Sequence, residues 1–240
     1  MHSCINTSLW WYIDVCVYHL FYFPKQILIL YNLLCSILSL YTMLGYAKGL
    51  FQCEHIFQKE PVSILKPYFF MYWLTKNIEL LDTVFMVLRH RRRQISFLHV
   101  YHHATMLLLS DYANHVTPWP AIAVFLAINS LVHVFLYSYY FVTVLYPSST
   151  PGWKQRLTEF QILQFFVDFI FAGIGYLHHG FCIYGLLYGI MMTALFSNFY
   201  YHTYLKNTQS SKKSLWGDRL SKLISNHSIK HVDYGFWYLP

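Results

Sequence analysis

The chain has 240 residues, of which 56% are hydrophobic, 20% aromatic and only 11% charged. Ordinary soluble domains carry about 25% charged residues, and a soluble core has no room for so much apolar surface. The formal net charge of +7 does not indicate nucleic acid as a partner, because the basic residues lie in short connections between apolar runs, where membrane topology explains them. The composition therefore predicts an all-α, polytopic integral membrane domain, which we place at residues 1–205.

Six apolar segments are long enough to cross a bilayer, which takes roughly 20 residues in a helix. An earlier run at residues 9–23 is interpreted as a short or partial first span, since it lacks the basic flank and the cleavage site of a signal peptide. The polar residues 206–240 show no apolar periodicity, which predicts a flexible tail. We therefore expect six or seven transmembrane helices, with the six clear ones at residues 27–47, 68–88, 97–115, 121–146, 160–178 and 181–205.

Lysine and arginine are unevenly distributed between the two sides of this arrangement. Short cytosolic loops of membrane proteins retain positive charge, so the side with more of these residues is expected to face the cytosol, together with the C-terminal tail. The opposite side carries Lys48, Lys59 and Lys66. The predicted cytosolic residues include Lys25, Arg89, Arg91, Arg92, Arg93, Lys154, Arg156 and Lys206.

The same topology places Cys53 and Cys182 on the non-cytosolic side, in or beside loops. An oxidising lumen permits a disulfide there, and we predict this pair as a hypothesis, with two unrelated thiols as the alternative. The chain has no C-x-x-C pair, so its cysteines do not indicate a zinc ribbon or a thioredoxin-type site.

The segment at 68–88 places Lys76, Glu79 and Asp82 in the middle of an apolar run. Each costs about 2.5 to 3.5 kcal/mol on the insertion scale if it faces lipid, so these side chains are expected to face a bundle interior or one another. Lys76 and Glu79 are i, i+3 neighbours and can pair on one face. Charged residues inside a span usually mark a functional site, and a structural ion pair between helices is the alternative.

The next span contains FLHVYHHATM, which places His99, His102 and His103 on one helical face. Simultaneous protonation of three crowded imidazoles is unfavourable, and neutral rings serve as nucleophiles, bases or metal ligands. A lone histidine in a helix is usually a structural residue. Three within five positions of a membrane span indicate a functional site instead.

A polar stripe is predicted on the span at 121–146. It contains NSLVHVFLYSYY, where Asn129, His133, Tyr137 and Tyr140 follow at spacings of four, four and three. Tyrosines near span ends are often interfacial anchors, which is the alternative for Tyr140. His133 lies deeper in the span and has no such explanation.

The span at 160–178 is entered by TEFQILQFF, where Gln161 and Gln164 share a face and Asp168 follows at greater depth. Amide side chains inside a membrane find hydrogen-bond partners on other helices or on a ligand. Both explanations are open for Gln161 and Gln164, and Asp168 is able to join either arrangement.

Together, KNIELLDT, HVYHH, NSLVHVFLYSYY, TEFQILQ and NFYYHTY occur in an order and spacing that resembles the fatty-acid elongases, from about Lys25 to Lys206. The resemblance implies an endoplasmic-reticulum membrane protein of seven helices, six of them in two inverted three-helix units around an acyl tunnel. It implies acyl-CoA and malonyl-CoA as substrates within membrane lipid, with no metal or redox cofactor. It also implies the reductases and the dehydratase of the elongation cycle as partners, and it leaves a homodimer open.

The reaction that this resemblance implies is a decarboxylative Claisen condensation that gives 3-oxoacyl-CoA, carbon dioxide and free CoA. The second histidine of the family's HxxHH box accepts the acyl group as an acyl-imidazole, and this position corresponds to His102. A covalent intermediate divides the reaction into two easier steps. His133 would assist acyl transfer or orient malonyl-CoA, while His99 and His103 tune the nucleophile.

Further side chains are assigned to binding and orientation. Glu79 and Asp82 are expected to hold Lys76 and a histidine in position, because unpaired charge inside the membrane is costly. Candidate donors to the enolate oxygen and other substrate contacts are Lys76, Asn129, Tyr137, Tyr140, Gln161 and Gln164. Candidate cations for the CoA phosphates are Arg89, Lys154, Arg156 and Lys206, for which positive-inside topology is the alternative explanation.

Two other classes of protein stay open. A membrane di-iron desaturase or hydroxylase also uses HxxHH, but it needs several such boxes, and beyond the first this chain offers His178 with His179 and two histidines in the tail. A seven-helix transporter or receptor would account for the charged residues of the segment at 68–88 but not for three histidines beside a polar stripe.

Overall fold

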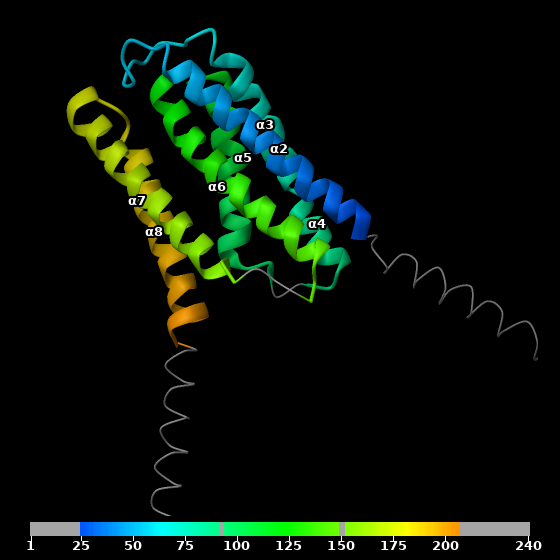
Figure 1. Ribbon diagram of the computed structural model, residues 1–240. Coiled ribbons are helices and arrows are strands. Elements are labelled where there is room, and N and C mark those ends of the chain that lie inside the picture. Colours follow the sequence, from blue (N-terminus) through cyan, green and yellow to red (C-terminus); the bar gives the residue numbers. More distant parts are fainter. Residues whose placement is uncertain (1–24, 92–93, 149–151, 207–240) are drawn as a thin grey trace, which may run out of the picture. The chain divides into compact units, whose positions relative to one another are not determined.

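The computed structural model describes residues 25–91, 94–148 and 152–206, and the regular secondary structure in these ranges is helical. The predicted first span at 9–23 and the tail after Lys206 lie outside the described residues. The chain divides after Phe196 into two compact units, the second of which is described by the end of α8 and a π-helix, Tyr201–Leu205. The helices in chain order are α2 (Lys25–Leu50), α3 (Lys66–Glu79), α4 (Leu81–Leu88), α5 (Phe97–His115), α6 (Pro120–Leu145), α7 (Lys154–His179) and α8 (Ile183–Tyr200) (Figure 1).

The observed helices agree closely with the predicted spans. The segment at 97–115 is α5 without change, and the other predicted spans fall on α2, α6, α7, and α8 with its π-helical end. Among the described helices, those four are long and apolar enough to cross a membrane, which identifies a multi-pass membrane protein. α3 and α4 have 14 and 8 residues, so neither is long enough to span a bilayer alone.

The segment at 68–88 was predicted as one helix, and this prediction is wrong in one respect: the helix is broken at Leu80. The N–H of Leu80 donates to the carbonyl of Asn77 at 3.3 Å, and the N–H of Thr83 donates to the carbonyl of Leu80 at 3.2 Å. These i to i+3 hydrogen bonds form a tighter 3₁₀ turn between α3 and α4. The break lies directly after Glu79 and before Asp82, so it changes the directions in which these two carboxylates leave the backbone.

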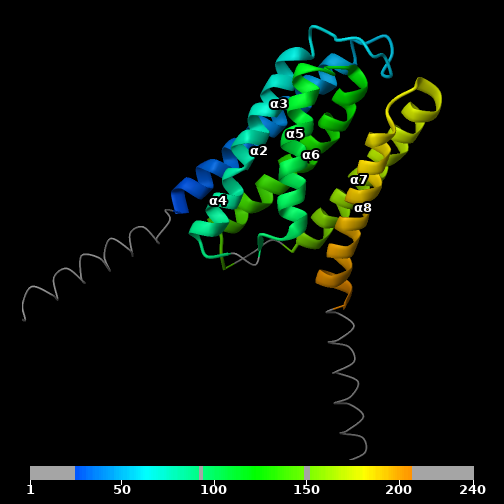
Figure 2. The same cartoon turned by 180° about the vertical axis from the view of Figure 1, so that it is seen from behind.

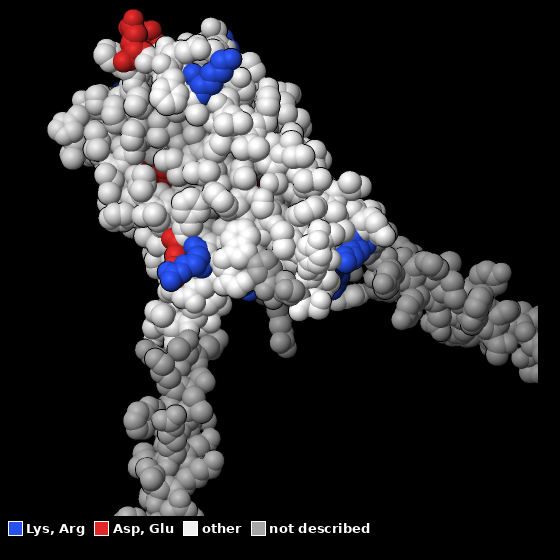
Figure 3. All heavy atoms as spheres, viewed as in Figure 1, with Lys and Arg blue, Asp and Glu red and all other residues white. Residues whose placement is uncertain are grey.

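The outer helix surfaces are apolar, as expected for contact with lipid. Leu30 and Leu44 on α2 are 65% and 56% exposed, and Leu177 on α7 is 73% exposed. On the face shown in Figure 3, charged side chains gather mainly near the ends of the helices, and the area between is almost entirely uncharged. Apolar patches of this extent are rare on soluble monomers and indicate a surface covered by hydrocarbon.

The longest helix contact is formed by α2 and α6, which lie side by side in Figures 1 and 2. Hydroxyl groups pair across it: Ser36 Oγ lies 3.0 Å from Ser138 Oγ, and Thr42 Oγ1 donates to Ser130 Oγ at 3.1 Å. Water does not compete for hydrogen bonds inside a membrane, so small hydroxyl residues permit close approach and bond between helices.

Glycine permits an equally close approach of α3 to α2. A Cβ atom on Gly45 would overlap the Tyr68 ring, and one on Gly49 would overlap the Leu65 side chain. The Tyr46 hydroxyl, between these glycines, donates to the Tyr68 carbonyl at 3.1 Å. The start of α3 is therefore held against the end of α2.

The connection from α2 to α3 also contacts the turn between α7 and α8. α7 ends at Gly180, which has a φ of 61°, and Lys59 Nζ donates to the Gly180 carbonyl at 2.7 Å. The Phe57 ring stacks on His179 with 4.2 Å between centroids and on Phe171 with 4.6 Å. These contacts join the first and last pairs of helices at the end of the bundle opposite to Arg89.

The predicted disulfide between Cys53 and Cys182 is not present, because both cysteines are free thiols in the structure. Cys53 Sγ donates instead to the Gly49 carbonyl at 3.2 Å, on the last turn of α2, and Cys182 is exposed. Burial also raises the pKa of the Cys53 thiol, which lowers the fraction of reactive thiolate.

We expect Gly45→Ala to destabilise the protein by about 1 to 3 kcal/mol, because the added methyl group overpacks the contact with Tyr68. Gly173→Ala is the matched control, since a Cβ there meets Leu186 at an ordinary 3.7 Å. The measurement is the midpoint of thermal unfolding in detergent, which should fall for Gly45→Ala and stay level or rise for Gly173→Ala. Equal midpoints for the two variants would contradict the close packing of α2 and α3.

Candidate functional site

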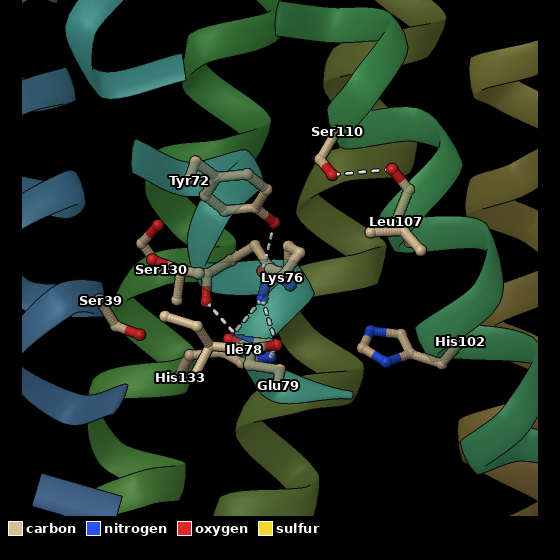
Figure 4. A network of polar contacts seen from close by, with 12 residues as sticks. Ser39, Tyr72, Lys76, Ile78, Glu79, His102, Leu107, Ser110, Ser130 and His133 are labelled. Atoms are coloured by element: carbon tan, nitrogen blue, oxygen red, sulfur yellow. Dashed lines mark hydrogen bonds and ion pairs between the residues drawn. The ribbon is translucent and has the colours of Figure 1, made fainter. Parts of the chain in front are cut away.

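An ion pair within α3 lies at the centre of the site (Figure 4). Lys76 Nζ lies 2.9 Å from Oε2 and 3.0 Å from Oε1 of Glu79, so the carboxylate holds the ammonium through both oxygens. The two residues are only 3% and 0% exposed. Lys76 Nζ also lies 4.9 Å from the centre of the Tyr72 ring, which adds a cation–π contact. The pair is neutral as a whole, which removes much of the cost of burying either charge.

The polar stripe on α6 faces α3 and α4, whereas the spacing of its residues predicted only that they share one face. The Tyr72 hydroxyl donates to Asn129 Oδ1 at 2.7 Å, and the Tyr137 hydroxyl donates to Asp82 Oδ2 at the same distance of 2.7 Å. Both bonds lie inside the protein. They fix α6 in register with the broken helix, and they fix the orientation of the Asn129 amide, whose NH₂ group remains a donor.

His133 lies between these two hydrogen bonds and next to the ion pair (Figure 4). Its Nδ1 is 2.9 Å from the carbonyl oxygen of Asn129, and because a carbonyl only accepts, Nδ1 carries a hydrogen. Its Nε2 is 3.6 Å from Oε2 of Glu79. In the neutral ring this Nε2 has a free lone pair, and a proton taken up there would be stabilised by the carboxylate. The geometry suits a base supported by Glu79.

The histidine box lies on the first turns of α5. The Ser96 side chain accepts from the backbone N–H of His99 at 3.2 Å and caps the helix. His99 Nε2 lies 2.9 Å from Thr83 Oγ1 on α4, and the His99 ring is 4.4 Å from the His103 ring between centroids. α5 packs along α3 (Figure 2), which brings this histidine face to the ion pair.

His102 is the member of the box that points into the site (Figure 4). Its ring is 6.2 Å from His133 with an angle of 16° between the planes, and 5.5 Å from His103. Phe165 of α7 and Phe196 of α8 pack against the His102 ring, with 6.4 Å and 6.2 Å between ring centroids. Among the described residues neither nitrogen of His102 has a hydrogen-bond partner. The ring is thus held by packing alone, with its nitrogens available for chemistry.

The predicted binding residues of α7 and the end of α6 have contacts on their own helices. Gln164 Nε2 donates to Asp168 Oδ2 on its own helix at 3.3 Å, and Gln161 is half-buried on the same helix. Asp168 Oδ1 is buried and has no hydrogen-bond partner among the described residues. Tyr140 is 36% exposed, and its ring packs against Tyr137 at 6.2 Å.

The predicted phosphate-binding cations are exposed and lie at helix ends rather than at the buried cluster. Arg89 follows α4, and Lys154 begins α7. Arg156 Nη1 pairs with Glu159 Oε2 at 2.8 Å, so its charge is partly compensated. Lys206 belongs to the second unit and is exposed. Two further arginines of the predicted cluster lie outside the described residues, namely Arg92 and Arg93.

Sequence reasoning missed the role of Tyr72, which bonds to Asn129 and contacts Lys76. Its signal was available, because Tyr72 precedes Lys76 by one helical turn and lies on the same face. Among the described residues no group of three or more His, Cys, Asp or Glu side chains is arranged to hold a metal ion. The polar contacts described above are formed within this one chain, either between two side chains or between a side chain and the backbone.

Comparison with known proteins identifies the family of this chain. A model of the GNS1/SUR4 family (ELO) matches residues 11–212. The very long chain fatty acid elongase 5 of Homo sapiens is 33% identical over 204 residues, which cover 79% of this chain and 68% of that protein. Those of Rattus norvegicus and Tachysurus fulvidraco are 34% and 31% identical, and the second covers 85% of this chain and 74% of the fish protein. The chain therefore belongs to the GNS1/SUR4 family, which confirms the resemblance of its motifs to the fatty-acid elongases.

Proposed function

We propose that the chain catalyses the condensing step of fatty-acid elongation, in which acyl-CoA and malonyl-CoA give 3-oxoacyl-CoA, carbon dioxide and CoA, through an acyl-imidazole on His102. The observation that carries the proposal is the position of His102. Its ring lies 6.2 Å from that of His133, beside the buried pair of Lys76 and Glu79, and its nitrogens have no partner among the described residues. Relatives that are known as very long chain fatty acid elongases support the same substrate class.

In the first half-reaction a nitrogen of His102 attacks the thioester carbonyl carbon. The carbon–sulfur bond breaks, an acyl-imidazole forms, and the proton given up by the ring passes to the CoA thiolate, so that CoA leaves as a thiol. His133 Nε2 is suited to carry this proton, because its Nδ1–H is fixed on the Asn129 carbonyl and Glu79 lies 3.6 Å away. A neutral imidazole is a competent nucleophile without a metal or a redox group.

In the second half-reaction malonyl-CoA loses carbon dioxide, and the resulting enolate carbon attacks the acyl-imidazole. Negative charge on the thioester oxygen of the enolate requires donors, and Lys76 and the NH₂ group of Asn129 are available inside the site. The Tyr72 hydroxyl holds that amide in place at 2.7 Å. The carbon–nitrogen bond to His102 breaks, and 3-oxoacyl-CoA is released.

The wider arrangement of the enzyme follows from the same proposal. We place it in the endoplasmic-reticulum membrane with its C-terminus in the cytosol, and we count α3 with α4 as one membrane span and α5 as another, which gives six spans in the described part. The acyl chain would lie between the helices, next to Phe165 and Phe196, which contact His102. Arg89, Lys154 and Arg156 are the proposed cations for the CoA phosphates.

The first test is intact-mass spectrometry of purified protein after incubation with a panel of acyl-CoAs. We expect a covalent acyl adduct on the wild type that disappears when malonyl-CoA is added, with release of 3-oxoacyl-CoA. His102→Ala should abolish the adduct, while the control His115→Ala, at the exposed end of the same helix, should retain it. An adduct of unchanged yield on His102→Ala would refute the assignment, and stoichiometric bound iron would favour the di-iron alternative.

A second prediction separates the structural role of the ion pair from its chemical role. Lys76→Met leaves Glu79 buried without its ammonium partner and should lower the free energy of unfolding by about 3 to 5 kcal/mol. The double variant Lys76→Met with Glu79→Met removes both charges and should recover most of that loss, because apolar side chains of similar volume replace a buried pair with little cost.

Both variants should nevertheless lose condensation, which is measured as product formed from acyl-CoA and malonyl-CoA. Thermal unfolding in detergent reports the stability of each variant. A double variant that regained both stability and turnover would show that the ion pair has only a structural role.

A further inference from the structure

The proposed reaction has a proton balance that the buried site cannot satisfy alone. Acylation conserves protons, since the hydrogen lost by His102 leaves with CoA. In the condensation the malonyl carboxylate leaves as carbon dioxide and supplies no proton, yet His102 must finish as neutral imidazole. Expulsion of an imidazolate is difficult, whereas expulsion of an imidazole from a protonated acyl-imidazole is easy. One proton per cycle must therefore enter from outside.

The structure contains a row of groups that leads from the start of α5 to His102. His99 lies in the first turn of α5, three residues after the exposed Ser96, and its Nε2 is 2.9 Å from Thr83 Oγ1. The His99 ring is 4.4 Å from that of His103, one turn deeper, and the His103 ring is 5.5 Å from that of His102. Each ring is in contact with the next.

We infer that His99 and His103 form a proton path that reloads the acylated His102 from cytosolic water during condensation. This inference rests on the proposed function. Imidazole suits the task because it takes a proton on one nitrogen and gives one from the other, and transfer between adjacent rings requires ring rotation or a bridging water molecule. Thr83 is a positioning residue, because its hydroxyl holds His99 Nε2 and leaves Nδ1 for exchange.

Charged and titratable groups from α3, α4 and α6 surround the inner end of this row. Glu79 lies 2.9 Å from Lys76 Nζ and 3.6 Å from His133 Nε2, so a proton that enters meets a buried ion pair that is neutral as a whole. Towards α6 the neighbouring groups are His133 and Tyr137, and on α4 the carboxylate of Asp82 accepts from Tyr137 at 2.7 Å. Consumption of the proton by the departing imidazole gives the transfer its inward direction.

The experiment follows the two half-reactions separately in the intact enzyme. Acyl-enzyme formation is measured by rapid quench and intact mass with acyl-CoA alone, and its decay is measured after addition of malonyl-CoA. For His99→Gln and His103→Gln we expect acylation within about twofold of the wild type and decay slowed by about 10²-fold, the usual contribution of general acid catalysis. His115→Gln is the matched control and should change neither rate.

Two further readouts distinguish proton supply from a structural role. The slowed decay should recover at lower pH or with added imidazole buffer, which can carry a proton into the site, and Thr83→Val should show a smaller defect in the same step. Equal loss of both half-reactions, or slow decay that neither pH nor imidazole restores, would overturn the inference. If the wild type forms no acyl-enzyme, the proposed function itself fails, and that outcome is visible before malonyl-CoA is added.

Discussion

The arrangement of this protein depends on the cost of placing charge where water is scarce. Lys76 and Glu79 are almost completely buried, and each would be strongly unfavourable without the other. Their pairing sets the position of the polar groups around them. Glu79 faces His133, Lys76 faces the Tyr72 ring, and Tyr72 in turn holds Asn129. α3 and α6 are thereby fixed against each other by polar contacts inside an apolar bundle, and α5 supplies His102 at the remaining open side of the pair.

Much of this arrangement was predictable from the sequence, because the apolar runs are long and the polar residues inside them are few. The helical periodicity correctly places Asn129, His133 and Tyr137 on one face, and all three contact α3 or α4. Periodicity identifies faces but not partners. For that reason Tyr72 was missed: its place one turn before Lys76 indicates a shared face, but tyrosine is common in membrane helices and the bond to Asn129 is not visible in the sequence.

Three other features could not be predicted from the sequence, each for a different physical reason. No proline or glycine stands near Leu80 to indicate the break in the sequence. The break consists of i to i+3 hydrogen bonds that form in the folded protein. The Gln164 amide was expected near substrate or another helix, yet Asp168 lies one turn away and offers a carboxylate on the same helix. Cys53 and Cys182 are predicted on the same side of the membrane, but topology does not determine the direction of a thiol, and Cys53 Sγ bonds back to α2.

The polar contacts of α2 and of α3 become available at different times during synthesis of the chain. Ser36 and Ser138 are 102 residues apart, so at about 5 to 20 residues per second α2 waits several seconds in the bilayer before α6 is synthesised. Between residues 26 and 47 α2 carries no charged side chain, and the Thr42 hydroxyl bonds to carbonyls of its own helix. α3 carries a lysine and a glutamate, and these are three residues apart on one helix. The segment most difficult to insert thus neutralises itself at once, without waiting for any later part of the polypeptide.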